Sequence, residues 1–154
     1  LMTLSTTSPS GECSFISWEP WLGTPKATSV TEFPLAGRED RLLTINLHAV
    51  NFALGLKELR QQLRALAELL GQHQGPVILA GDLNTWSGQR QTVVDNFTNE
   101  FGLGAIAFTP DLRTKVFGRA LDHIYIRGLQ AQSAQAIPVS SSDHNPLRVR
   151  LAFN

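Results

Sequence analysis

The stretch VILAGDLNTWS, from Val77 to Ser87, joins a continuous apolar run to a carboxylate, Asp82, and an amide, Asn84. A short apolar run of this kind is typical of a β-strand buried on both faces. Asp and Asn after a strand are ordinary turn formers, so the stretch by itself favours a structural interpretation. Because rigid strand ends also hold active-site groups, the rest of the chain has to decide between the two.

The composition indicates one packed domain without a charge bias. The chain has 154 residues, of which 42% are hydrophobic, and its 13 Lys and Arg balance its 13 Asp and Glu. This balance lowers the expectation of tight, sequence-independent DNA binding, which depends on phosphate neutralisation. The single cysteine, Cys13, excludes an internal disulfide and a thiolate metal site, and it fits a reducing, cytoplasmic compartment. No apolar run approaches the roughly 18 residues of a membrane span.

Hydrophobic periodicity predicts a mixed α/β or α+β domain. The β-branched segment 27–35 and the alternating segment 41–50 are predicted to form a hairpin across the turn at 37–40. In the second segment, alternate residues lie on one face and place His48 on the other.

Two helices and further strands are predicted in the rest of the chain. Leucines at steps of three and four indicate an amphipathic helix over 54–70 that stops at Gly71. Ser87 is placed to cap a second helix over 88–101. Strands are expected at 105–110, 120–129, 134–140 and 144–153, and loops at 5–25 and 111–119.

Four polar clusters share one position, the end or the polar face of an apolar strand. They are His48 in NLHAVN, Asp82 with Asn84 in GDLN, Asp122 in LDHIYI, and Asp143 with His144 in SDHNP. Each cluster alone has an ordinary explanation as a turn or a surface group. Together, three carboxylates, two imidazoles and an amide can bind a hard cation, deprotonate a water and hydrogen-bond a phosphoryl oxygen.

These motifs resemble the C-terminal half of the endonuclease/exonuclease/phosphatase superfamily, the DNase I-like fold, and in particular its bacterial YafD-like branch. GDLN, LDHI and SDHNP occur in the family's order, and NLHAVN matches the family's histidine-bearing strand. The resemblance implies half of a four-layer α/β/β/α sandwich: one mixed, mostly antiparallel sheet with helices on its outer face. We therefore expect residues 1–154 to be a single domain that is the C-terminal part of a longer one.

The resemblance implies a metal-dependent hydrolase of phosphate esters, a phosphodiesterase, nuclease or phosphatase that uses in-line attack by water. His48 would hydrogen-bond the scissile phosphate or protonate the leaving oxygen. Asp82 would orient or deprotonate the water, and Asn84 would hold a phosphoryl oxygen. Asp122 would orient His144, and this pair would contact the phosphate or act as the base. Whether Asp82 or His144 is the base stays open, because coupled groups share their protons.

The same resemblance implies a bound Mg²⁺ or Mn²⁺, with Asp143 as ligand directly or through water. The family's first half also supplies a metal-binding Glu, which Glu12 and Glu19, in the predicted loop, do not match. We therefore expect weak metal affinity and little hydrolysis by this chain without the missing N-terminal half of the fold. One sheet without its partner would expose a large apolar face, which we expect a second copy of the chain or the N-terminal segment to cover.

Two alternatives remain open at this point. One is a non-catalytic binding or scaffold domain that keeps the fold, which the retained polar set disfavours. The other is an unrelated α/β protein, which would follow if His48 and His144 lay far apart. Nucleic acid, inositol phosphates, sphingolipid head groups and nucleotide cofactors are all candidate substrates. Candidate contacts to them are Arg90, Arg113, Lys115 and Arg119 for phosphate and Trp86 for a base, although scattered surface cations are common.

Overall fold

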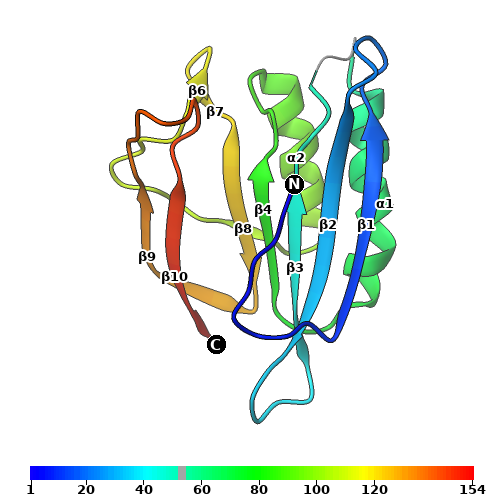
Figure 1. Cartoon of the computed structure of the whole chain (residues 1–154), viewed down its shortest axis with the longest axis vertical. Helices are drawn as coiled ribbons and strands as arrows, with labels where there is room; N and C mark the ends of the chain where they lie inside the picture. Colours follow the sequence, from blue (N-terminus) through cyan, green and yellow to red (C-terminus); the bar gives the residue numbers. More distant parts are fainter. Residues whose placement is uncertain (52–54) are drawn as a thin grey trace.

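A computed structural model of the chain describes residues 1–51 and 55–154. Its elements are β1 (Gly11–Trp18), β2 (Pro25–Pro34), β3 (Arg41–Leu47), α1 (Lys57–Gln72), β4 (Val77–Asp82), α2 (Gly88–Glu100), β5 (Gly104–Ala105), β6 (Lys115–Val116), β7 (Arg119–Ala120), β8 (Asp122–Arg127), β9 (Leu129–Ala136) and β10 (Leu147–Phe153). Within these residues the main sheet has six strands in the order β1-β2-β3-β4-β8-β5 (Figure 1). Strands β9 and β10 form a separate pair, as do β6 and β7.

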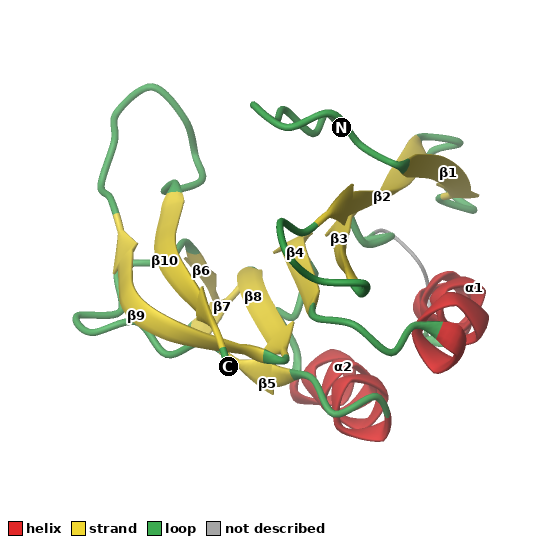
Figure 2. Cartoon of the chain, turned by 90° about the horizontal axis from the view of Figure 1, so that it is seen from below, coloured by secondary structure: helices red, strands yellow, loops and turns green. Residues whose placement is uncertain are grey.

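Both helices lie on the same face of the main sheet (Figure 2). Every strand pair in that sheet is antiparallel except β3 with β4. The predicted class, a mixed and mostly antiparallel sheet with helices on one face, is therefore confirmed. Neither helix in the described ranges has the length and apolar composition needed to cross a lipid bilayer.

The predicted hairpin is present as β2 and β3, whose register pairs Val30 with Ile45. In β3 the alternate residues Leu43, Ile45 and Leu47 are buried against the helices, as the alternation predicts. The predicted loop over 5–25 is wrong in its centre, because β1 forms there and pairs with β2. Since β1 is an edge strand with both faces largely exposed, its sequence carries no hydrophobic alternation to reveal it.

Strand β4 is buried on one face only, which corrects the prediction of burial on both. Val77 and Leu79 are fully buried beneath the helices, whereas Ile78 and Ala80 on the other face are partly exposed. An apolar run shows that a strand is hydrophobic on both faces, but it does not show whether both faces are covered by other elements. The second face of the sheet, called the open face below, carries no helix in the part of the chain that the structure describes (Figure 2).

The helices follow the predicted periodicity with changes at their ends. The predicted start of the first helix at Leu54 lies outside the described residues. Gly71 does not end α1, which runs to Gln72. Ser87 caps α2 as predicted, since its side chain accepts a hydrogen bond from the backbone N–H of Arg90.

The last third of the chain departs most from the predicted boundaries. Strand β8 is confirmed, but β9 begins directly after it and ends where Pro138 would interrupt the predicted strand 134–140. Gly128, with φ of 68°, allows this immediate reversal. The predicted strand 105–110 is reduced to the short β5, and the predicted loop 111–119 contains β6 and the start of β7. These pieces are too short to leave a period in the sequence.

Candidate active site

The carboxyl ends of β3 and β4 and the start of β8, which carry candidate residues, lie at one end of the main sheet (Figure 1). Because β3 and β4 are parallel, their carboxyl ends lie together, and the antiparallel β8 begins at the same edge. His48 follows β3, Asp82 ends β4, and Asp122 opens β8 directly opposite Asp82 in the register. The topology therefore gathers side chains that lie far apart in the sequence.

The turn after β4 presents Asp82 in a fixed orientation. The backbone N–H of Asn84 donates to Asp82 Oδ1 over 2.9 Å, which forms a tight turn with Asn84 at φ of 49°. The Asn84 side-chain NH₂ donates to Ala49 O at 3.0 Å and to Asp82 Oδ2 at 3.2 Å. Both of its hydrogens are thus used to hold the carboxylate and the neighbouring loop, and Asn84 is only 3% exposed.

A buried arginine joins the loop after β3 to the turn after β4. Arg90, 2% exposed, donates from Nε to Asn84 O over 2.6 Å and from its Nη2 to Val50 O. Its guanidinium lies 5.6 Å from the centre of the Trp86 ring. Arg90 was a candidate for phosphate contact, but the structure buries it behind the site, where it positions backbone.

Asp122 and His144 form the closest side-chain pair among the six candidate residues. His144 Nδ1 lies 2.7 Å from Asp122 Oδ2. Burial raises the pKa of Asp122, and this effect outweighs the hydrogen bond from His144. Burial lowers the pKa of His144, but the hydrogen bond and charge of Asp122, with Asp82 and Asp143, outweigh burial and raise it. Asp122 therefore stabilises the imidazolium form of His144 relative to that of a free histidine.

His48 lies on the other side of Asp82, in contact with a lysine. Its Nε2 is 3.5 Å from Asp82 Oδ2 and 3.1 Å from the Nζ of Lys26. Burial first, and then the charge of Lys26, lower the pKa of His48 against the opposing effects of Asp82 and Glu19. A neutral ring accepts the Lys26 hydrogen bond at Nε2, which then has no proton to donate to Asp82.

Two residues of this region were missed at the sequence level. Lys26 was not a candidate, and Glu19 was dismissed as a loop residue. Glu19 is 1% exposed, and its Oε1 accepts from Asn51 N at 2.9 Å and lies 3.6 Å from Lys26 Nζ. The available signal was the stretch EPWLGTPK, in which an acid and a base flank a Gly turn before a strand.

The loop that carries Asp143 and His144 is attached to the loop before β6. The hydroxyl of Thr114 donates to Asp143 O at 2.9 Å and accepts from Asn145 N at 3.1 Å. Asn145 Nδ2 also donates to Leu112 O over 2.7 Å. The side chain of Asp143 is exposed beside His144.

The donor set fits a divalent cation only in part. In the ranges 1–51 and 55–154, no three His, Cys, Asp or Glu side chains gather into a shell that could hold a metal ion. Asp143 offers an exposed carboxylate, while both oxygens of Asp82 and Oδ2 of Asp122 already accept hydrogen bonds. A single such carboxylate suits the kind of Mg²⁺ site that keeps water ligands and relies on substrate oxygens.

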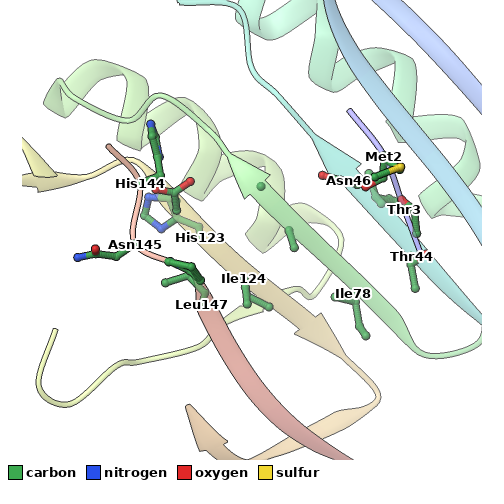
Figure 3. Close-up of a pocket in the computed structure, with 15 residues that line it drawn as sticks. Met2, Thr3, Thr44, Asn46, Ile78, His123, Ile124, His144, Asn145 and Leu147 are labelled. Carbon is green, nitrogen blue, oxygen red and sulfur yellow. Dashed lines mark hydrogen bonds and ion pairs between the residues drawn. The ribbon is translucent and has the colours of Figure 1, made fainter. Parts of the chain in front are cut away.

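A pocket of about 470 Å³ extends from the site along the open face of the sheet (Figure 3). Its size falls within the usual range for small-molecule sites. His144 and Asn145 lie at one end, where Asp122 contacts His144. Met2 lies at the other end beside Asn46, whose Nδ2 donates to Met2 O over 3.1 Å. The N-terminal segment thus lies along part of the open face. That a second copy of the chain covers the open face stays a prediction.

The other candidate substrate contacts are mostly engaged with the protein. Arg113 donates to Asp111 Oδ1 at 2.8 Å and to Asp122 O at 3.2 Å, which places it behind Asp122. The Nζ of Lys115 lies 3.4 Å from Oδ2 of Asp111. Trp86 donates from Nε1 to Asn51 Oδ1 and meets the ring of Phe117 edge-on. Arg119 remains exposed.

The chain is similar to known proteins in both sequence and structure. The family model of the Endonuclease/Exonuclease/phosphatase family matches residues 8–144. A UPF0294 protein of Vibrio vulnificus strain YJ016 is 41% identical over 150 residues, which cover 97% of this chain and 52% of that protein. The chain thus spans about half the length of the curated relatives it matches.

Solved structures share the fold at low identity. An endonuclease/exonuclease/phosphatase family protein from Bacteroides thetaiotaomicron matches with a TM-score of 0.66 at 19% identity, over 96% of this chain and 66% of that one. A mannosyl-6-phosphatase from Bacteroides thetaiotaomicron VPI-5482 matches with a TM-score of 0.64 at 21% identity, over 95% and 67%.

Proposed function

Because the chain belongs to the endonuclease/exonuclease/phosphatase family, and within it to the YafD-like UPF0294 group as predicted, we propose that its site hydrolyses phosphate esters by in-line attack of water. The observation that carries the proposal is the arrangement around Asp82, which has an imidazole on each side. One imidazole pairs with a carboxylate and the other with an ammonium group. A scaffold domain would not need two imidazoles whose pKa values are shifted in opposite directions beside one carboxylate.

In the proposed mechanism the attacking water binds at Asp82. The Asn84 amide and backbone hold this carboxylate in place, so it can orient the water and accept its proton as the phosphorus is attacked. Asn84 could also donate to a phosphoryl oxygen, as the resemblance implies, but only by giving up one of its two present bonds.

His144 supplies positive charge where negative charge grows in the transition state. Its Nδ1 is held by Asp122, which leaves Nε2 for a phosphoryl or leaving oxygen. A neutral His48 that accepts from Lys26 at Nε2 carries its proton on Nδ1, and this N–H could donate to the phosphate, whereas protonating the leaving oxygen would first require the ring to gain a proton.

A divalent cation, Mg²⁺ or Mn²⁺, belongs to the proposal because the family generally uses one. Asp143 would hold it together with water and substrate oxygens, and the ion would neutralise charge on the phosphate. The chain itself contributes one exposed carboxylate to this role, so we expect weak metal affinity. Consistent with that, we propose that the chain is part of a longer domain whose other half completes the metal site.

The test is phosphate release from a panel of phosphate esters, measured on this chain and on its longer parent with Mg²⁺. In the parent, Asp82→Asn should keep the turn, because an amide oxygen can replace Oδ1, yet it should lower the rate about 10²–10⁴-fold. Asp40→Asn is the matched control, since Asp40 pairs with Arg38 beside an exposed turn away from the candidate residues. Unchanged release by Asp82→Asn would contradict the proposed role.

The alternative is a binding or scaffold domain that keeps the fold. It predicts that no ester in the panel is hydrolysed by the parent, with or without Mg²⁺ or Mn²⁺. Substantial Mg²⁺-dependent hydrolysis by this chain alone would instead show that its catalytic set is already complete.

A further inference from the structure

The side chain of Lys26 reaches the end of β3 from the start of β2. Its Nζ lies 3.1 Å from Nε2 of His48 and 3.6 Å from Oε1 of Glu19. Its side chain is 16% exposed, so the ammonium is partly withdrawn from water but still accessible. Lys26 therefore brings a positive charge to the side of Asp82 opposite the Asp122–His144 pair.

The ordinary explanation is that Lys26 only neutralises the buried carboxylate of Glu19. The distances argue against this as its sole role. Glu19 already accepts a hydrogen bond at each oxygen, from Asn51 N and from the Thr24 hydroxyl. The ammonium lies closer to the imidazole of His48 than to Glu19, and 3.6 Å is beyond a normal hydrogen bond.

The contacts of Lys26 also leave it capacity to bind an anion. An ammonium group has three N–H donors, and within the described part of the chain Lys26 makes one bond to His48 and the longer ionic contact to Glu19. Lysine binds phosphate as a point charge and needs no fixed planar geometry.

We infer that Lys26 is a phosphate-binding residue of this site, held in place by Glu19 and His48, so that the substrate phosphate lies between Lys26 and His144. The inference rests on the proposed function, because it assigns a further contact to the same phosphate. It adds a cation from β2, a strand on which neither the sequence motifs nor the proposed mechanism had placed a functional group. When a phosphate binds, Lys26 would donate to it while Glu19 keeps the lysine side chain in place.

The test uses inorganic phosphate as the probe and histidine ring signals in NMR spectra as the readout. Addition of phosphate should shift the signals of His48 and His144, while those of His73 and the buried His123 serve as internal references. Lys26→Met should raise the half-saturating phosphate concentration about tenfold, the loss expected for one charge-assisted hydrogen bond. Lys26→Arg should retain most of the binding. Lys57→Met, which removes the same charge from the exposed start of α1, should bind as the unchanged chain does.

A double variant separates phosphate binding from neutralisation of Glu19. If Lys26 only offsets the carboxylate, Glu19→Gln with Lys26→Met should restore normal phosphate binding, and that result would overturn the inference. If Lys26 binds phosphate, the double variant should stay about tenfold weaker. Unchanged binding by Lys26→Met alone would overturn the inference and leave the proposed function standing. If phosphate shifts neither His48 nor His144 in the unchanged chain, the proposed function fails and the inference with it.

Discussion

The two histidines beside Asp82 stand in opposite electrostatic surroundings. His144 lies against the carboxylate of Asp122, which raises its pKa despite burial, whereas His48 is partly buried beside the ammonium group of Lys26, and its pKa is lowered. One ring is therefore suited to donate a proton and the other to accept a hydrogen bond. The contrast teaches that the residue type alone does not assign a role, because the neighbour of each ring decides its charge.

The largest expected effect comes from removing the negative charge of Asp122, which contacts His144. Asp122→Asn keeps a side chain of the same shape, but the pKa of His144 should fall because its main raising influence is gone. Phosphate release by the parent should drop about 100-fold or more. An NMR titration of His144 together with the rate measurement checks both parts. A full rate with a lowered pKa would show that the charge on His144 is not needed.

The next largest effect is a loss of stability when Arg90 is replaced, and it should not change the surroundings of His144. Arg90→Met leaves Asn84 O and Val50 O without their buried donor and should cost about 2–4 kcal/mol of the free energy of unfolding. Urea denaturation measures this, with Arg60→Met on the exposed face of α1 as control. The pKa of His144 should stay unchanged, since its contact with Asp122 does not involve Arg90. A large shift there would show that the two sides are coupled.

A smaller effect should follow when the cation beside His48 is removed. Lys26→Met should raise the pKa of His48, because the charge of Lys26 is the second cause of its lowering after burial. Titration of the ring signals by NMR gives the shift directly, with His123 in the same spectra as a reference. No change in the pKa of His48 would mean that Lys26 does not face the ring in solution.

The smallest effect is the dependence of stability on pH. Because the pKa of His144 is raised in the folded state, its protonation stabilises the fold fully below about pH 6.5, and this contribution is lost as the pH rises through the folded pKa. His48 behaves oppositely, since its lowered pKa makes its protonation costly to the folded state in acid. Denaturation midpoints at pH 5.5 and pH 8.5 should show that His144→Gln loses more stability at the lower pH, by less than about 1 kcal/mol. A greater loss at the higher pH would contradict this.

The sequence was most informative where a period or a motif persisted over many residues. The alternation in β3 and the leucine steps of α1 predicted their buried faces, and LDHI and SDHNP pointed to Asp122 and His144, which the fold brings together. The sequence was least informative where burial depends on contacts with residues far away in the sequence. Strand β1 is an edge strand without alternation. Ile78 and Ala80 were predicted to be buried, although no helix of residues 1–51 and 55–154 covers their face of the sheet.

The sequence by itself determined the family, the class of fold and the six polar residues of the candidate site, because these follow from short motifs and from their order along the chain. The tertiary structure alone decided their environments. It placed Lys26 against His48. It buried Arg90 behind the turn after β4, where the guanidinium cannot contact a phosphate in the site. It also engaged both amide hydrogens of Asn84, one with Ala49 O and one with Asp82. Charge state and hydrogen-bond partner depend on neighbours from other strands, and those neighbours meet only when the sheet is assembled.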